Sequence, residues 1–198
     1  MIKVIENTIS EKDLEQIRNI IGQPEEDIIW YLNKDITIKS DTKALININS
    51  VPTYQISHPI YERGRLTYQS YKFIYDLIDD IFKRNGCYGR LARVKLNILF
   101  NHRDMTEDKY NTPHVDMECE HYNMIIFLND SDGDTVFFNE YFSKNLNDVT
   151  VRQRISPKPN RSVISDGLMH TSSNPLKNDI RVVLNAVLEK TINKINKE

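Results

Sequence analysis

The stretch Val94-Lys95-Leu96-Asn97-Ile98-Leu99-Phe100 lies where the chain changes from helical patterning to a series of strands. Further candidate strands follow it: Tyr122 to Leu128, Thr135 to Asn139, Val149 to Ile155, Ser162 to Ser165 and Ile180 to Leu188. Turn-forming residues separate them, including the Asp166-Gly167 pair. Many short strands with turns at near-regular intervals are typical of an antiparallel sandwich or barrel. This part of the sequence therefore predicts a mainly β fold.

Residues 1–90 have a mixed and mostly helical pattern. Apolar residues at helical spacing predict one helix from Ser10 to Gly22 and a second from about Tyr68 to Arg84, which the Asn85-Gly86 pair would end. Residues 28–60 predict short strands and loops. We expect the helices to flank one outer face of the barrel.

These patterns predict one domain over residues 1–198. Residues 1–90 would form a helical and mixed support region, residues 91–190 the β core, and residues 191–198 a polar tail. A chain of 198 residues is long enough for one domain with a sizeable core.

Composition excludes several classes of protein. A net charge of −2 argues against a strongly basic nucleic-acid-binding surface, so nucleic acid is disfavoured as a partner. Two distant cysteines make neither a disulfide scaffold nor a cysteine-based zinc site. No apolar run is long enough to cross a bilayer, and the first residues lack the apolar core of a secretion signal. We therefore expect a cytoplasmic protein with no membrane partner. The bias toward Ile, Asn and Lys fits an AT-rich bacterial or viral genome, and a viral protein would act in the host cytoplasm.

The segment Thr112-Pro113-His114-Val115-Asp116 carries the first chemical signal. In an extended chain, residues two positions apart point to the same side, so His114 and Asp116 could offer a nitrogen and an oxygen to one point. Alone, the pair is equally an ordinary solvated loop. His170, after the Asp166-Gly167 turn, could add a third ligand from a distant strand. Two histidines and one carboxylate are the usual cage for non-haem Fe(II).

Arg181 is the second signal, because it opens the apolar strand that runs to Leu188. A guanidinium at the mouth of a barrel strand is costly unless it faces an anion, and its fork suits a carboxylate. Gly133 and Thr135 lie between two predicted strands downstream of Asp116.

The ordered set of His-x-Asp, a strand ending in Leu-Asn, Gly-x-Thr, a distal His and a following Arg resembles the Fe(II)- and 2-oxoglutarate-dependent dioxygenases. Within them, the chain is most similar to the prolyl-4-hydroxylase-like subgroup, which includes small bacterial and phage members. The resemblance covers about Val94 to Leu188. It implies a double-stranded β-helix (a jelly-roll, cupin-like barrel) with flanking helices. It also implies Fe(II), 2-oxoglutarate as cosubstrate and O₂, with ascorbate as a supporting reductant. The reaction would yield succinate, CO₂ and a hydroxylated substrate.

The same resemblance assigns roles to single residues. His114, Asp116 and His170 match the iron ligands, which are also the catalytic residues, and Arg181 matches the residue that holds the far carboxylate of 2-oxoglutarate. Strand parity extends this reading. If Arg181 points inward, so do Val183, Asn185 and Val187.

A second strand can be read the same way. Phe127 occupies the position of an inward aromatic residue, so Ile125 and Asn123 should share its face. Many relatives have a tyrosine there, whose hydroxyl contacts 2-oxoglutarate. Because Phe127 has no hydroxyl, we expect Asn123 or Thr135 to supply that hydrogen bond. Asn97 would either contact the ligand or make a structural hydrogen bond.

The expected function is hydroxylation of a peptidyl residue, with proline as the first candidate, or of a free amino acid or other small molecule. Repair of alkylated nucleobases by the same chemistry is an alternative, but such relatives usually carry another Arg where this chain has Val187. A catalytically silent β-helix used for binding is the non-enzymatic alternative, although such proteins normally lose a ligand or the anchor. The motifs specify neither the substrate nor the oligomeric state.

Overall fold

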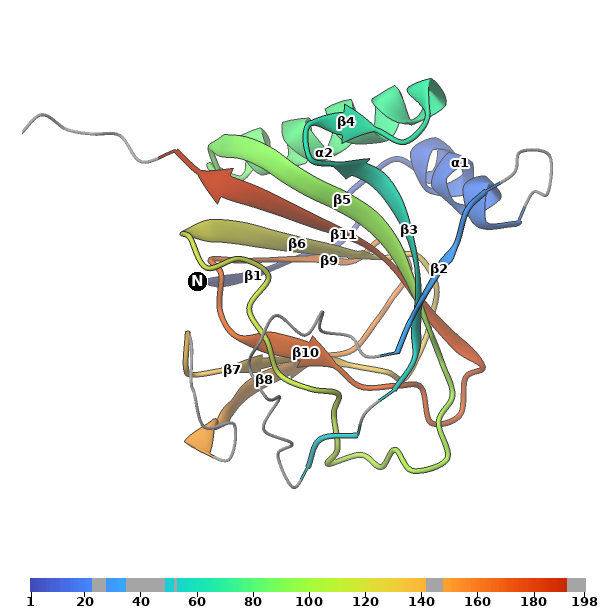
Figure 1. The fold of residues 1–198 in the computed structure, drawn as a ribbon, viewed down its shortest axis with the longest axis vertical. Helices are drawn as coiled ribbons and strands as arrows, with labels where there is room; N and C mark the ends of the chain where they lie inside the picture. The colour runs from blue at the N-terminus through green and yellow to red at the C-terminus, as the bar shows by residue number, and fades with distance from the viewer. Residues whose placement is uncertain (23–27, 35–48, 52, 142–147, 192–198) are drawn as a thin grey trace, which may run out of the picture.

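The computed structural model describes residues 1–22, 28–34, 49–51, 53–141 and 148–191. Its architecture is two antiparallel β-sheets, one larger than the other, with two helices outside the larger one (Figure 1). The strands of the large sheet are β1 Ile2–Ile5, β2 Tyr31–Asn33, β3 Gln55–Glu62, β4 Arg65–Leu66, β5 Gly89–Phe100, β6 His121–Phe127, β9 Ser162–Ser165 and β11 Ile180–Lys190. Those of the small sheet are β7 Thr135–Phe138, β8 Val151–Ile155 and β10 His170–Ser172. The predicted mainly β, jelly-roll class with flanking helices is confirmed.

The order of strands brings distant parts of the sequence together. Among the described residues, the large sheet has the order β1-β9-β6-β11-β5-β3-β2, with β4 paired to β3, and the small sheet has the order β10-β7-β8. The long strand β11 therefore lies at the centre of the large sheet, between β6 and β5. The small sheet faces the large one across the interior (Figure 1).

Both predicted helices are present and cover the outer face of the large sheet. Helix α1 spans Glu11–Gly22, and Ser10 caps it, because its hydroxyl accepts a hydrogen bond of 3.1 Å from the Asp13 backbone N–H. Helix α2 spans Lys72–Arg84 and follows a 3₁₀ turn at Gln69–Tyr71. The apolar faces of both helices pack in one core cluster with the outward side chains of the large sheet. The helices therefore bury one face of the sheet and leave the other to the interior of the barrel.

Alternation along β11 assigns its side chains to opposite faces. Val182, Leu184, Ala186 and Leu188 belong to the core that the helices cover. Arg181, Val183 and Asn185 point to the other side, where they line a cavity between the sheets. This is the parity predicted from the sequence, and it follows from the two-residue period of a strand.

Strand β6 alternates in the same way. Met124 and Ile126 pack with the helices, whereas Ile125 and Phe127 pack inside the barrel against Val183. The inward orientation expected for Phe127 and Ile125 is therefore confirmed.

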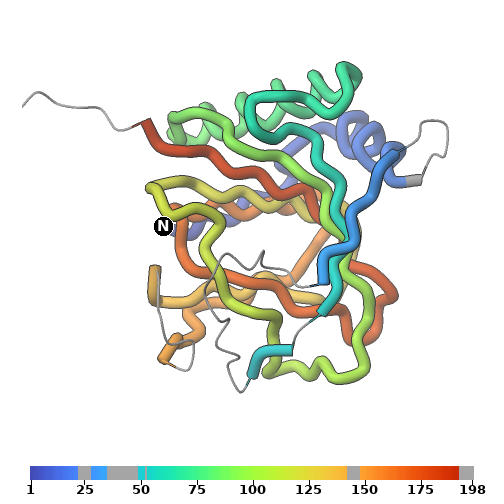
Figure 2. Tube along the Cα trace, viewed as in Figure 1, coloured from blue at the N-terminus to red at the C-terminus, as the bar shows by residue number. Residues whose placement is uncertain are grey.

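Four strands of the large sheet, β1 to β4, come from residues 1–66 and were not individually predicted. Strand β1 pairs with β9 at one edge of the sheet, where the blue and orange traces run side by side in Figure 2. Strand β3 contains Pro59, and its pairing with β5 shifts register between Pro59 and Tyr61. Proline has no backbone N–H to donate, which is why it is found at such irregularities.

Two remaining expectations concern the ends of the chain and the membrane. Most of the expected polar tail, residues 192–198, lies outside the described residues. No helix within the described part of the chain has both the length and the apolar character that a membrane span needs.

Candidate metal centre

The backbone brings the two histidines of the predicted triad together. His114 and His170 form an antiparallel bridge, in which each backbone N–H donates to the carbonyl of the other at 2.9 Å. His170 begins β10, and His114 lies in the connection between β5 and β6. The spacing of the two imidazoles is therefore set by main-chain hydrogen bonds between segments that are far apart in the sequence.

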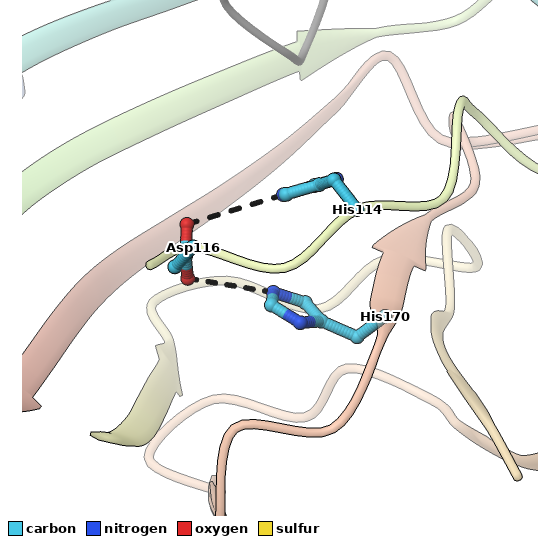
Figure 3. A group of neighbouring side chains, drawn as sticks. All are labelled: His114, Asp116 and His170. Carbon is cyan, nitrogen blue, oxygen red and sulfur yellow. Dashed lines mark ion pairs between the residues drawn. The ribbon is translucent and has the colours of Figure 1, made fainter. Parts of the chain in front are cut away.

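Asp116 completes a compact group of three possible ligands (Figure 3). Its Oδ2 lies 3.6 Å from His170 Nε2, and its Oδ1 lies 4.0 Å from His114 Nε2. One ligand atom from each residue falls within 4.8 Å of the other two. Two ligands about 2 Å from one ion and at right angles to each other are about 3 Å apart. Small side-chain rotations would therefore close this set around a metal ion.

Both histidines are held with Nε2 free. His114 Nδ1 lies 3.2 Å from the carbonyl of Thr112, and His170 Nδ1 lies 3.0 Å from the carbonyl of Leu168. A ring whose Nδ1–H donates to a carbonyl keeps the lone pair on Nε2, which is the usual arrangement in metal-ligating histidines. Burial lowers the pKa of His114 to about 4 and also lowers the pKa of His170. Both rings are therefore neutral at pH 7, as metal ligands must be.

The two oxygens of Asp116 have different surroundings. Burial alone would raise the pKa of this carboxyl, but Arg93 and the two histidines outweigh burial and hold the pKa well below its usual range. Oδ1 accepts a hydrogen bond of 2.5 Å from Arg93 Nη2. Oδ2 is buried and has no hydrogen-bond partner. A buried carboxylate oxygen without a partner is rare, and one that faces an imidazole nitrogen fits a bound cation. The donor set thus suits the metal that the sequence predicted.

Replacing Arg93 with Met is expected to destabilise the metal-free protein by about 2 kcal/mol, because it leaves a buried carboxylate without its charged donor. This loss corresponds to a fall of roughly 4–8 °C in Tm for a chain of this size. Thermal and urea unfolding of the metal-free protein at pH 7 measure both quantities. Arg90→Met is the matched control on the same strand, because Arg90 pairs with Glu189 in an exposed ion pair. It is expected to leave stability nearly unchanged. Equal losses in the two variants would contradict the role assigned to Arg93.

Arg181 lies deeper in the same cavity and is only 3% exposed. Its Nη2 donates to Thr135 Oγ1 at 2.7 Å, and its guanidinium lies 5.5 Å from the centre of the Phe127 ring. Burial lowers its pKa to about 10, so it is still charged at pH 7. It forms no ion pair with any described carboxylate, and its Nε has no hydrogen-bond partner. A buried guanidinium without an anionic partner has the chemistry to hold a carboxylate.

Gly133 allows this position of Arg181. A Cβ atom at residue 133 would lie 2.7 Å from the carbonyl oxygen of Ser173 and 3.1 Å from Arg181 Cδ. The backbone of Gly133 therefore approaches Arg181 more closely than any other residue type would permit.

The three other residues that the sequence predicted to contact 2-oxoglutarate lie in different parts of the site. Asn97 lines the cavity, and its Oδ1 is buried without a partner. Thr135 accepts the hydrogen bond from Arg181. Asn123 lies behind the metal group, with its Nδ2 3.4 Å from His170 Nδ1 and its Oδ1 without a partner. Asn97 thus adjoins the space that a ligand would occupy, whereas Thr135 and Asn123 contact the predicted site residues themselves.

Sequence reasoning missed two cations beside the triad. Arg93 bonds Asp116, and Lys95 lines the cavity together with the triad and Arg181. Both share the inner face of β5 with Asn97, at the two-residue spacing of a strand. Extending the parity of Asn97 back along this strand would have found them.

The sequence matches no protein-family model, and no curated protein matches it. Solved structures do resemble the fold. An oxidoreductase of the 2OG-Fe(II) oxygenase family from Burkholderia pseudomallei has a TM-score of 0.62 at 11% identity, over 94% of this chain and 84% of that one. A viral collagen prolyl hydroxylase from Paramecium Bursaria Chlorella virus-1 has a TM-score of 0.52 at 10% identity, over 95% and 96%. A prolyl hydroxylase from Trichoplax adhaerens has a TM-score of 0.57 at 10% identity, over 96% and 83%. The chain therefore has the fold of the 2OG-Fe(II) oxygenases.

Proposed function

We propose that this protein is an Fe(II)- and 2-oxoglutarate-dependent oxygenase that hydroxylates a C–H bond of its substrate. The observation that carries the proposal is the unpartnered Oδ2 of Asp116, which lies 3.6 Å from Nε2 of His170. The other oxygen of the same carboxylate lies 4.0 Å from Nε2 of His114, and both histidines are neutral. The unpaired guanidinium of Arg181 lines the same cavity. A metal-ligating group and an isolated cation in one cavity are what a chelating dicarboxylate requires.

In this proposal His114, Asp116 and His170 hold the iron, and the three protein ligands leave coordination positions for 2-oxoglutarate and O₂. Bound iron would supply the coupling of 2-oxoglutarate oxidation, to succinate and CO₂, with insertion of an oxygen atom into a C–H bond. Arg181 binds the far carboxylate of 2-oxoglutarate, and Thr135 fixes the direction of its guanidinium. Arg93 keeps the Asp116 carboxylate ionised and oriented. Asn97, Thr135 and Asn123 remain our candidates for further hydrogen bonds to the cosubstrate, and ascorbate is the proposed supporting reductant.

For the substrate, we propose a peptidyl or free amino acid, with proline first. The likeness to prolyl hydroxylases supports proline, but the same fold also occurs in SnoN, an epimerase from nogalamycin biosynthesis (TM-score 0.59, 10% identity). A fold shared by such different reactions does not select a substrate. Nucleobase repair is less well supported, because Val187 stands where such relatives carry a second arginine.

Adding Fe(II) and 2-oxoglutarate to the metal-free protein under argon is expected to produce a weak visible charge-transfer band. Zn(II) in place of Fe(II) is the control and should give no band. Stoichiometric iron binding without the band would contradict chelation of the metal by 2-oxoglutarate. Admission of O₂ should then release succinate. A band with no succinate release, with or without proline peptides, free amino acids or methylated oligonucleotides, would favour the silent binding module.

A further inference from the structure

Lys95 is a cation of the cavity that the proposed function does not use. It lies at the middle of β5, where it stands opposite Asn185 on β11 and Pro59 on β3. It lines the same cavity as Asp116 and Arg181. Among the described residues, no hydrogen-bond acceptor or carboxylate pairs with its ammonium group. Lysine normally extends its charged end into water, so an inward lysine without a partner is an unusual feature.

The electrostatic surroundings of Lys95 are unfavourable as they stand. Burial and, to a smaller extent, neighbouring Arg93 lower its pKa to about 8, although Asp116 acts in the opposite direction. Asp116 is already bonded to Arg93, and its free oxygen faces His170. Lys95 is therefore not the partner of the triad carboxylate. A second anion in the cavity would satisfy it.

The charge of the cosubstrate is already matched without Lys95. In the proposed function, the metal takes the keto-acid end of 2-oxoglutarate and Arg181 takes its far carboxylate. Each end of the dianion then has one cationic partner. The positive charge of Lys95 remains for a molecule other than 2-oxoglutarate.

A second cavity, on the far side of the Arg93–Asp116 contact, also carries positive charge. It is lined by Arg63, Arg90 and Arg93, together with Glu62. Arg93 relates the two cavities, because it lines the second and bonds Asp116, which lines the first. Arg90 pairs with Glu189, whereas Arg63 has no ion pair with a described residue. Such a surface raises the local concentration of anions.

Neutral amides complete the surroundings of Lys95. Asn97, Asn185 and Gln55 line the cavity with it. The Oδ1 of Asn97 is a buried acceptor without a partner, two residues from Lys95 on the same face of β5. An amino acid carries a carboxylate close to an N–H donor. The carboxylate would face the ammonium group of Lys95, and the N–H group would face Oδ1 of Asn97.

We propose that Lys95 binds the carboxylate of the primary substrate, so that the enzyme acts on a molecule with a free carboxyl group. This inference rests on the proposed function and narrows its substrate class. The carboxylate belongs to a free amino acid or to the C-terminal residue of a peptide. An internal peptide residue other than Asp or Glu has no carboxylate, and such a residue is excluded as the preferred substrate.

The test uses the full chain with Mn(II) and saturating 2-oxoglutarate under argon, where no turnover occurs. The probes are the common L-amino acids, their C-terminal amides, and dipeptides with free or amidated C-termini. Binding is measured by thermal shift and then by calorimetry. Asp and Glu are left out of this comparison, because their amides keep a side-chain carboxylate. We expect at least one of the other acids to stabilise the protein while its amide does not, because amidation removes the negative charge that would face Lys95. The comparison of amino acids with dipeptides identifies the source of the carboxylate.

Lys95→Met should weaken binding of that acid about tenfold or more and change 2-oxoglutarate affinity less than about threefold. Lys72→Met is the matched control, because it removes the same charge from an exposed i,i+4 pair on α2.

A wild-type protein that binds no acid better than its amide overturns the proposal without any variant. Loss of 2-oxoglutarate affinity in Lys95→Met equal to that in Arg181→Met also overturns it, since Lys95 would then serve the cosubstrate. Failure of wild-type protein to bind 2-oxoglutarate at all refutes the proposed function instead.

Discussion

Replacing His170 with alanine is expected to abolish stoichiometric iron binding. The imidazole supplies one of the three ligand atoms that lie within 4.8 Å of one another, and alanine offers nothing in its place. Loss of an outer partner of a metal ligand typically costs about 10- to 100-fold in affinity, so loss of a ligand should exceed roughly 100-fold. Anaerobic equilibrium dialysis against Fe(II), with iron quantified per chain, measures the change.

The control for this variant is His102→Ala. His102 is partly exposed, and its Nδ1 accepts a hydrogen bond from the Asp104 backbone N–H. It should bind iron as the wild type does. Circular dichroism establishes that both variants fold, and the main-chain bridge between His114 and His170 does not depend on the side chain. Full iron occupancy in folded His170→Ala protein would refute the triad.

Replacing Arg181 with Met is expected to lower the affinity for 2-oxoglutarate by about 2–5 kcal/mol, which is about 30-fold to several thousand-fold. The guanidinium is almost fully buried and pairs with no described carboxylate, so a bound carboxylate would interact with it in a poorly solvated site. Titration of 2-oxoglutarate into the Mn(II)-loaded protein under argon gives the dissociation constant. Iron or manganese binding alone should be unchanged, because Arg181 is not a ligand.

Two variants sharpen this result. Arg152→Met removes the same charge from an exposed position on β8 and should leave the affinity unaltered. Arg181→Lys keeps a charge but loses the fork, so it should fall between the wild type and Arg181→Met. An unchanged dissociation constant in Arg181→Met would place the anchor elsewhere, with Lys95 as the remaining cation of the cavity.

Local sequence patterns predicted the parts of the fold that depend on the spacing of apolar residues in helices and strands and on turn-forming residues. The alternation of β11 and β6 follows from a strand period of two, so the inward orientation of Arg181, Val183 and Phe127 could be inferred from the amino-acid sequence alone. Helix α1 could be inferred from its cap and its apolar spacing. Strand β1 could not, because a four-residue strand at a sheet edge owes its existence to pairing with β9, about 160 residues away.

In the site, too, some residues could be identified from local sequence patterns, whereas others depend on contacts between distant strands. His114, Asp116 and His170 were identified because their spacing and order have a chemical meaning. Arg93 and Lys95 were missed because a charged residue in a strand normally indicates a solvated face. Only the position of β5, paired with β11 on one side and β3 on the other, places them in the interior. The hydrogen bond of Thr135 to Arg181 likewise depends on how the two sheets face each other.

The main-chain bridge between His114 and His170 has a thermodynamic consequence. In small zinc domains, the ligands converge only when the ion binds, so much of the binding free energy is consumed by folding. Here two of the three ligands are joined by reciprocal backbone hydrogen bonds of 2.9 Å that need no ion. The site is thus preorganised, and loading of the metal is uncoupled from folding of the chain. Such a protein can lose and regain its ion without passing through the unfolded state.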